Sequence, residues 1–409
     1  MREILSKVKK TTTSLAKLSN SKKSEILEEM AFQIDLARYD ILKQNKKDVE
    51  YATKMNYSKA MIERLSLDEA KIDAIMTSLE ETAKLADPVG RILSTWERNG
   101  LEFKKVSIPI GVICVVYESR PNVTSEVAGL CFKSGNACVL KGGKEAINSN
   151  KAIVKALHTA LEKFNIDKNC ITFLDIDREA VSELVKMDKF IDVVIPRGGA
   201  ALIKSICENS TIPVIKHDKG LCHIFIDASA NIETAVKICV NAKIQKPSAC
   251  NAVETLLVHE KVAKAFLPTL KNEYAKYGVE IYGCNKTANI IKCANVGLTS
   301  YQTEYLDLAL NIKVVKNVKE AIEHIQRYSS SHSEAIISKD NKSIEEFVNS
   351  LDSACLYINA STRFSDGFEF GFGAEVGIST NKLHARGPMG LDELTTYKYI
   401  VRGNGQIRK

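Results

Sequence analysis

The sequence predicts a mixed α/β protein in which two parallel sheets are each covered by helices. Short apolar runs alternate with helix-like stretches over two long regions, residues 109–227 and 232–359. Strands that follow one another through helices form parallel sheets covered on both faces. The length of 409 residues and the hydrophobic share of 45% are enough for two or three domains. We therefore expect two sheets with a cleft between them.

The first 86 residues are predicted to be helical. The stretch Ser21–Lys47 carries apolar residues close to a 3.6-residue period. The stretch Ser66–Ala86 repeats this pattern and stops at Asp87-Pro88. We expect these helices to have a structural role.

A β-hairpin is predicted at residues 96–108. Asn99-Gly100 stands between two extended arms, and this dipeptide is the strongest short-range hairpin signal. The last segment, residues 397–407, also has an extended pattern. Exposed strands of this kind pair with the edge of another subunit. The sequence therefore predicts a small β flap for oligomerisation.

Nine apolar runs are expected to form the strands of the two sheets. The first region supplies residues 111–117, 137–140, 171–174, 191–195 and 221–226. The second region supplies residues 253–258, 312–315, 334–337 and 355–358. The glycine-rich stretch 363–390 has no periodic pattern, and long loops of this kind are usually functional.

Composition excludes several classes of protein. The eleven cysteines contain no CxxC pair and the seven histidines no HExxH, so we expect neither disulfides nor a metal site. The net charge of +7 is spread along the chain, which argues against nucleic-acid binding. No apolar run is long enough for a signal sequence or a membrane span. We expect a cytoplasmic protein without a nucleic-acid or membrane partner.

Cys250 lies in a short polar break between a helix-like run, residues 232–244, and a strand-like run, residues 253–259. A thiol reacts as the thiolate, which requires nearby N–H groups or cations and room for a substrate. A single cysteine among eleven is usually a packing residue. The neighbours Pro247, Ser248 and Asn251 are unfavourable inside a buried element, which favours a functional role for the thiol.

Three turns lead from a predicted strand into a helix. In the first, Asn122 either caps the following helix or offers its amide N–H to an oxyanion, with Arg120 meeting an anionic group. These residues alone favour the cap. The other two turns place glycines and cations before a helix: Lys141-Gly142-Gly143 and Pro196-Arg197-Gly198-Gly199.

The Lys141 turn is either an anion site at the start of a helix or a tight turn with solvated lysines. In the Pro196 turn, N–H groups beside an arginine can hold a pyrophosphate. Two such turns on one sheet favour a dinucleotide site there. The glycines Gly371, Gly373 and Gly377 do not have the spacing of the Rossmann motif.

Four segments together resemble the γ-glutamyl phosphate reductases, or glutamate-5-semialdehyde dehydrogenases, of the aldehyde dehydrogenase superfamily. They are PIGVICVVYESRPNVTSEVAGLCFKSGNACVLKGG, VVIPRGGAALIKSICENSTIPVIKHDKGLCHIFID, NAKIQKPSACNAVETLLVH and GAEVGISTNKLHARGPMGLDELTTYKYIVRGNGQIR. The resemblance implies an aldehyde dehydrogenase-like fold with a cofactor-binding domain at 1–227 and a catalytic domain at 228–360. Residues 361–396 would return to the cofactor domain with active-site loops, and 397–409 would be the oligomerisation strand.

The resemblance implies that Cys250 is the nucleophile and that Asn122 is the oxyanion donor, in place of the cap. The Lys141 turn, with Gly142 and Gly143, would bind the cofactor, and Lys141 would reach the adenosine ribose and its 2′-phosphate. The turn from Pro196 through Arg197, Gly198 and Gly199 would lie along the cofactor, and Glu304 would approach the nicotinamide ribose.

The implied activity is the NADPH-dependent reduction of L-glutamyl 5-phosphate to L-glutamate 5-semialdehyde and phosphate in proline biosynthesis, through a cysteine thioester. The substrate carries a phosphate and an α-carboxylate, so the site needs cationic or donor side chains. The candidates are Arg120, Lys243, Lys246, His384 and Arg386.

Two departures bear on this interpretation. Lys216 and His217 stand where hydrolysing aldehyde dehydrogenases carry a glutamate, which favours a reductase that needs no activated water. Lys141 and Lys246 stand where the family often has arginine, and lysine keeps the charge but loses the bidentate fork.

Alternative functions are an aldehyde dehydrogenase-fold oxidoreductase for a different aldehyde or acyl phosphate, and a non-catalytic anion-binding or assembly module. The presence of both Cys250 and Asn122 argues against the second. The resemblance also implies a homo-oligomer, a dimer or a tetramer, and is compatible with an association with glutamate 5-kinase.

Overall fold

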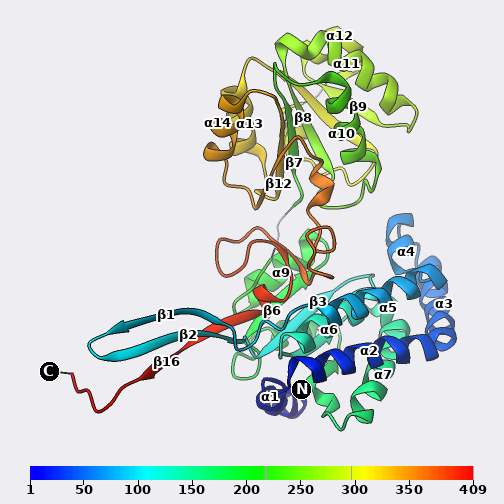
Figure 1. Ribbon diagram of the computed structural model, residues 1–409. Coiled ribbons are helices and arrows are strands. Elements are labelled where there is room, and N and C mark those ends of the chain that lie inside the picture. Colours follow the sequence, from blue (N-terminus) through cyan, green and yellow to red (C-terminus); the bar gives the residue numbers. More distant parts are fainter. Residues whose placement is uncertain (217–218, 296, 409) are drawn as a thin grey trace. The chain divides into compact units, whose positions relative to one another are not determined.

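The computed structural model describes residues 1–216, 219–295 and 297–408, and the chain divides into two compact units. Unit 1 comprises Met1–Lys216, Gly371–Gly377 and Pro388–Lys409. Unit 2 comprises His217–Phe370 and Ile378–Gly387. Each unit contains a parallel sheet with helices, as the sequence predicts (Figure 1).

Unit 1 begins with a series of helices. They are α1 (Arg2–Leu15), α2 (Asn20–Leu36), α3 (Arg38–Lys54), α4 (Lys59–Leu65) and α5 (Glu69–Lys84). The periodic stretch at residues 21–47 falls on two helices, because the chain turns at Ala37 between α2 and α3. Arg38 holds this corner by donating to Asp35 and to Glu69 and Asp73 of α5, at 2.7–2.9 Å.

The parallel sheet of unit 1 has the strand order β5-β4-β3-β6. Its strands are β3 (Val112–Tyr117), β4 (Ala137–Lys141), β5 (Ile171–Phe173) and β6 (Val193–Arg197). The helices that follow them are α6 (Asn122–Lys133), α7 (Ile147–Lys163), α8 (Arg178–Leu184) and α9 (Ala200–Asn209). The order changes direction between β3 and β6, and ligands of such sheets bind at the carboxyl ends of the strands at this point.

A separate antiparallel sheet of three strands also belongs to unit 1. Its order is β1 (Ile92–Arg98), β2 (Leu101–Pro109) and β16 (Thr395–Arg402). The turn residues Asn99 and Gly100 have φ values of 54° and 73°, the left-handed geometry that a two-residue hairpin turn requires. The predicted hairpin and the strand from the C-terminal segment are therefore confirmed, and every residue of β1 is exposed.

The sheet of unit 2 has the order β10-β9-β11-β8-β7-β12-β13. Its strands run parallel: β7 (Cys222–Ile226), β8 (Val253–His259), β9 (Glu280–Gly283), β10 (Ala294–Asn295), β11 (Ala309–Val315), β12 (Ser333–Ile337) and β13 (Cys355–Ile358). Ile224 and Ile226 pack with α10 (Ile232–Ile244) and α11 (Glu260–Ala275). Phe225 packs with α13 (Val318–Tyr328) and α14 (Asn341–Ser350), so both faces of this sheet are covered.

The expected domain boundary at residue 227 is wrong. The run at residues 221–226 was expected in the first sheet, but β7 is a central strand of unit 2, between β8 and β12. A strand buried on both faces has the same apolar pattern in either sheet, so the pattern alone does not identify its neighbours.

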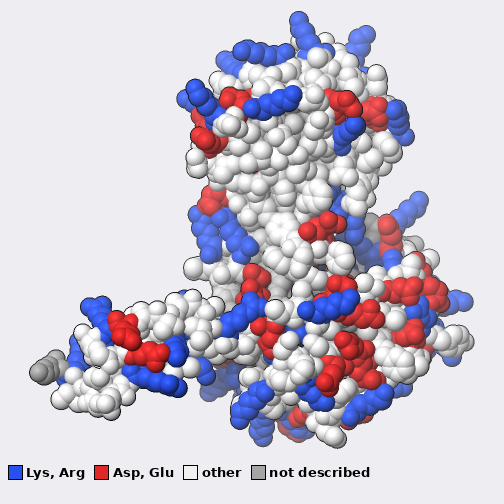
Figure 2. Space-filling model, viewed as in Figure 1, with Lys and Arg blue, Asp and Glu red and all other residues white. Residues whose placement is uncertain are grey.

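The remaining elements are short. They are the strands β14 (Gly377–Ser379) and β15 (Gly387–Met389), the helix α12 (Asn285–Ile291) and the 3₁₀ turns η1 (Lys144–Ala146), η2 (Lys168–Cys170), η3 (Leu298–Gln302), η4 (Thr362–Phe364) and η5 (Asp392–Leu394). In the part of the chain that the structure describes, no helix is long and apolar enough to span a membrane. Figure 2 shows lysine and arginine interspersed with aspartate and glutamate over the visible face.

Candidate active site

Cys250 lies, half-buried, in the turn between α10 and β8, as the sequence predicts. Two backbone bonds shape this turn: Ala249 N–H donates to the Lys246 carbonyl at 3.1 Å, and Ala252 N–H to the Ala249 carbonyl at 3.0 Å. Beneath it, the buried Cys222 thiol donates to the Cys250 carbonyl at 3.3 Å. The backbone that carries the candidate nucleophile is therefore held by the sheet below.

Gly220 packs directly against the backbone of Cys250. A Cβ atom built on Gly220 would lie 1.9 Å from the Cys250 carbonyl oxygen and 2.7 Å from its Cα, so no other residue fits. The Gly220 N–H donates to Glu304 Oε1 at 2.8 Å. Within unit 2, Gly220 thus links Glu304 to the Cys250 turn. The sequence did not indicate this role of Gly220.

The turn η4 is joined to the residue after Cys250. Thr362 Oγ1 donates to the Asn251 carbonyl at 2.7 Å, and Asn251 Nδ2 donates to the Ser365 carbonyl at 2.9 Å. This turn carries Arg363, whose Nε donates to Gln245 Oε1 at 2.7 Å. Burial lowers the pKa of Arg363, and Cys250 is the strongest of the negative groups that oppose this shift.

Asn122 and Arg120 lie in unit 1, at the carboxyl end of β3. Asn122 is the first residue of α6, and Pro121 occupies the cap position without a side-chain bond, so the cap interpretation is wrong. The Asn122 Nδ2 donates instead to Glu126 Oε1 at 2.9 Å, one helical turn further on. This bond orients the amide, and Asn122 and Arg120 are both half-buried.

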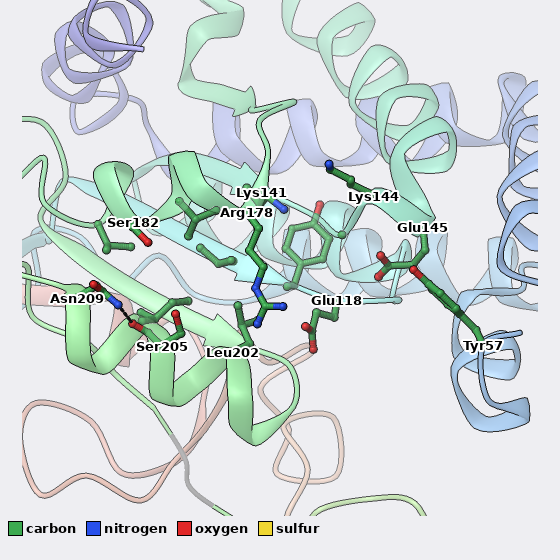
Figure 3. A pocket seen from close by; sticks show the side chains of 16 residues that line it. Tyr57, Glu118, Lys141, Lys144, Glu145, Arg178, Ser182, Leu202, Ser205 and Asn209 are labelled. Atoms are coloured by element: carbon green, nitrogen blue, oxygen red, sulfur yellow. Dashed lines mark hydrogen bonds between the residues drawn. The ribbon is translucent and has the colours of Figure 1, made fainter. Parts of the chain in front are cut away.

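A cavity of about 350 Å³ opens at the carboxyl ends of β3 and β4 in unit 1 (Figure 3). This volume lies within the usual range for small-molecule sites. Lys141, Lys144 and Arg178 supply positive charge to its lining, and Figure 3 shows the Arg178 guanidinium beside Glu118. Lys141 is buried, and desolvation lowers its pKa. Lys144 belongs to the turn predicted as an anion site, whereas Arg178 of α8 was not predicted there.

Two glycines of the Lys141 turn are required by close contacts. A Cβ on Gly142 would meet Asn150 Nδ2 at 2.1 Å, and one on Gly143 would meet Glu145 Oε1 at 2.1 Å. The same Glu145 oxygen accepts bonds from the Ser119 N–H at 2.6 Å and from its hydroxyl at 2.8 Å. The turns after β3 and β4 are therefore locked together beside the cavity.

The turn after β6 has one of its N–H groups engaged by the chain itself. Glu118 Oε2 accepts the Gly199 N–H at 2.9 Å, so a carboxylate of the chain occupies the start of α9. A Cβ on Gly198 would meet that same oxygen at 2.4 Å. Arg197 extends from the end of β6, where Pro196 is buried, to Glu375 Oε1 at 3.6 Å.

Lys243 does not belong to the substrate site, contrary to expectation. Its side chain is fully buried and donates to Glu254 Oε2 at 3.1 Å and to the Asp307 carbonyl at 3.2 Å. Burial lowers the pKa of Lys243 and raises that of Glu254 to about 7. The attraction between the two charges opposes both shifts. Lys243 also continues the apolar face of α10 formed by Val236 and Cys239, a pattern that could have revealed its burial.

The other predicted substrate residues remain candidates. Lys246 and His384 are exposed in unit 2. Arg386 Nη1 donates to Asp352 Oδ1 at 2.5 Å, and Lys382 also binds this carboxylate, which together hold the pKa of Asp352 down to about 2. Lys216 is half-buried, whereas His217 lies outside the described residues.

The comparisons with known proteins agree with the fold. Residues 1–285 match the model of the aldehyde dehydrogenase family. The γ-glutamyl phosphate reductase of Nautilia profundicola is 56% identical over 411 residues, with all of both chains covered. The crystal structure of the γ-glutamyl phosphate reductase of Thermotoga maritima is 45% identical, with a TM-score of 0.96 over 100% of this chain and 99% of that one.

A more distant neighbour shares the fold alone. The glyceraldehyde-3-phosphate dehydrogenase of Methanocaldococcus jannaschii, solved in complex with NADP, is 15% identical, with a TM-score of 0.72 over 98% of this chain and 94% of that one. The predicted aldehyde dehydrogenase-like fold is thereby confirmed. The chain belongs to the aldehyde dehydrogenase family and, within it, to the γ-glutamyl phosphate reductases.

Proposed function

We propose that this chain reduces L-glutamyl 5-phosphate to L-glutamate 5-semialdehyde and phosphate in proline biosynthesis, with NADPH as reductant and Cys250 as nucleophile. The single observation that carries the residue assignment is the position of Cys250. It lies in a turn fixed by Gly220, Cys222 and Asn251, at the amino end of a central strand of unit 2. This arrangement keeps the thiol half-exposed while its backbone stays rigid.

The Cys250 thiolate attacks the acyl carbon, and the C–O bond to phosphate breaks to leave a thioester. Asn122 donates its amide N–H to the oxyanion that forms, and the bond to Glu126 keeps that amide oriented. The nicotinamide supplies the hydride that reduces the thioester to the aldehyde level. Cys250 then leaves as the thiolate when the thiohemiacetal collapses and releases the semialdehyde.

The cofactor preference rests on the cavity of unit 1. The family uses a nicotinamide cofactor, and the Methanocaldococcus neighbour binds NADP. The three cations Lys141, Lys144 and Arg178 at one cavity suit the additional 2′-phosphate of NADPH. Glu118 and Glu145 lie there too, but each already accepts a backbone N–H. The Lys141 turn, with Gly142 and Gly143, is proposed to bind the cofactor beside this cavity, and Glu304 is proposed to bind the nicotinamide ribose.

A homo-oligomer, a dimer or a tetramer, is proposed from the three-stranded sheet. Exposed apolar side chains lie on its outer strands, among them Ile92, Trp96 and Tyr399. Edge strands with such side chains favour pairing with another subunit. The cytoplasm is the proposed compartment, because the eleven cysteines are all free thiols. The association with glutamate 5-kinase stays a prediction.

The test of the proposed function runs the reaction backward, because glutamyl phosphate is labile. The enzyme is supplied with 1-pyrroline-5-carboxylate, phosphate and NADP, and NADPH is followed by absorbance. Formation of NADPH that requires phosphate and is lost in Cys250→Ala supports the proposal. Formation without phosphate would instead indicate a hydrolytic aldehyde dehydrogenase.

Cys284 provides a matched control for this experiment. Its thiol is also half-buried; burial opposes its ionisation, but hydrogen bonds from Thr287 and from the Val314 N–H outweigh this and lower its pKa. It is therefore the kind of thiol that chemical reagents modify. Cys284→Ala is expected to leave the reaction intact.

A further inference from the structure

Arg363 is fixed beside Cys250 by contacts that the sequence does not indicate. The turn η4 that carries it is bound to the residue after Cys250 by the buried side chains of Thr362 and Asn251. The Asn251 Nδ2 also lies 3.4 Å from the Arg363 carbonyl oxygen. The backbone of Arg363 therefore cannot move independently of the Cys250 turn.

The Arg363 side chain is held by Gln245, which precedes Cys250 in the chain. Its Nε donates to Gln245 Oε1 at 2.7 Å, and Gln245 follows α10 directly. Among residues 1–216, 219–295 and 297–408, neither Nη group has a hydrogen-bond partner, and no carboxylate forms an ion pair with Arg363. The guanidinium is half-buried, and both of its Nη groups are available as donors to an anionic ligand.

Several charged groups act on this guanidinium. Burial lowers the pKa of Arg363, and the charges of Cys250, Asp366, Cys222 and Glu369 oppose the shift in that order. Of these negative groups, Cys250 in its ionised form opposes the shift most. Asp366 and Glu369 act on it without an ion pair in the described part of the chain.

The proposed reaction needs a cation at this place. Thiolate attack brings one anion against an acyl carbon that carries a second, the phosphate, and the electron pair of the breaking C–O bond adds charge to the phosphate oxygen. The planar guanidinium offers two parallel N–H donors that match phosphate oxygens. With Nε engaged by Gln245, the Nη groups are the donors left for this role.

We propose that the Nη groups of Arg363 bind the phosphoryl group of the acyl phosphate as it leaves the carbon attacked by Cys250, and bind inorganic phosphate in the reverse reaction. This inference rests on the proposed function. As the Cys250 sulfur bonds to the acyl carbon, the carbon–oxygen bond to phosphate breaks and Arg363 neutralises the departing anion. The phosphate oxygen keeps the electron pair of the broken bond, and the phosphate takes up one proton from water to leave as hydrogen phosphate.

The experiment measures the reverse reaction in Arg363→Gln and Arg363→Lys. The KM for phosphate is expected to rise about 10- to 100-fold in the glutamine variant and less in the lysine variant, which keeps the charge but loses the fork. The KM for 1-pyrroline-5-carboxylate is expected to stay within about twofold of wild type. Arg327→Gln is the control, because Arg327 is an exposed arginine of α13 in the same unit.

Other outcomes overturn the proposal. A rise in the KM for 1-pyrroline-5-carboxylate with an unchanged KM for phosphate would assign Arg363 to the α-carboxylate. An altered pH dependence of Cys250 alkylation by iodoacetamide, again with an unchanged KM for phosphate, would assign it to the thiolate alone.

A second variant keeps the inference testable if the Arg363 variants fail to fold. Gln245→Ala removes only the bond that orients the guanidinium, and a several-fold rise in the KM for phosphate is expected. Unchanged phosphate kinetics in Gln245→Ala and Arg363→Lys together refute the inference. If the wild-type enzyme itself forms no NADPH in response to phosphate, the proposed function fails, which is a different result.

Discussion

Gly220 and Cys250 are in backbone contact so close that a methyl group on Gly220 would overlap the Cys250 carbonyl oxygen. In Gly220→Ala the two segments must move apart, which displaces the thiol and breaks the bond to Glu304. Because a displacement of about 1 Å in an active site can cost about 100-fold in rate, we expect a fall of that order in kcat/KM. Steady-state kinetics of the reverse reaction measures it.

Gly278→Ala is the control for this substitution. Gly278 has a φ of 70° in a turn of unit 2, and a Cβ there would meet no atom within 4 Å. Strain in the left-handed region should lower its stability by about 1–2 kcal/mol and leave kcat unchanged. Equal kinetic losses in both variants would contradict a specific role for Gly220.

Asn122→Ala is expected to lower kcat about 100- to 1000-fold, the usual loss when one oxyanion donor is removed. The rate of Cys250 alkylation should not change, because the amide acts on the oxyanion and not on the free thiol. Glu126→Ala should cause a smaller loss, since it removes only the bond that orients the amide. Unchanged turnover in Asn122→Ala with a lower melting temperature would show that Asn122 only stabilises helix α6.

Lys243→Ala and Lys246→Ala are expected to separate a structural lysine from a candidate substrate lysine. Removal of Lys243 leaves the buried Glu254 without its cation, which should cost about 3–5 kcal/mol of unfolding free energy. Lys246 is exposed, so its removal should change stability by no more than about 0.5 kcal/mol. Urea denaturation of both variants measures this. Equal stability of the two variants would contradict the structural role of Lys243.

As pH rises, binding of NADPH should begin to weaken at a lower pH than the ordinary lysine pKa of 10.5 would predict. Burial lowers the pKa of Lys141 below 10.5, and of its charged neighbours Glu145 is the largest opposing influence. As pH rises Lys141 therefore loses its proton sooner, and with it the attraction for the 2′-phosphate. NADH, which has no 2′-phosphate, should show no such dependence, and Lys141→Arg should abolish it for NADPH. Identical pH profiles for both cofactors would exclude this role for Lys141.

Local patterns predicted much of this molecule. The bounds of α10, the hairpin turn at Asn99 and the Cys250 turn all depend on residues close together in sequence, where turn and helix signals act. The sheet that contains β7 and the roles of Gly220 and Arg363 depend on contacts between distant segments. A glycine and an arginine in loops carry no local signal of such contacts. The burial of Lys243 is the exception, because its place on the apolar face of α10 was visible in the sequence.

The most direct test of the central claim is to trap the acyl group on Cys250. The enzyme is mixed with 1-pyrroline-5-carboxylate and NADP without phosphate, quenched in acid, digested and examined by mass spectrometry. We predict one equivalent of NADPH per active site and a glutamyl thioester on the peptide that contains Cys250, which phosphate then discharges. NADPH formation with an unmodified Cys250, or with the acyl group on another residue, would contradict the account.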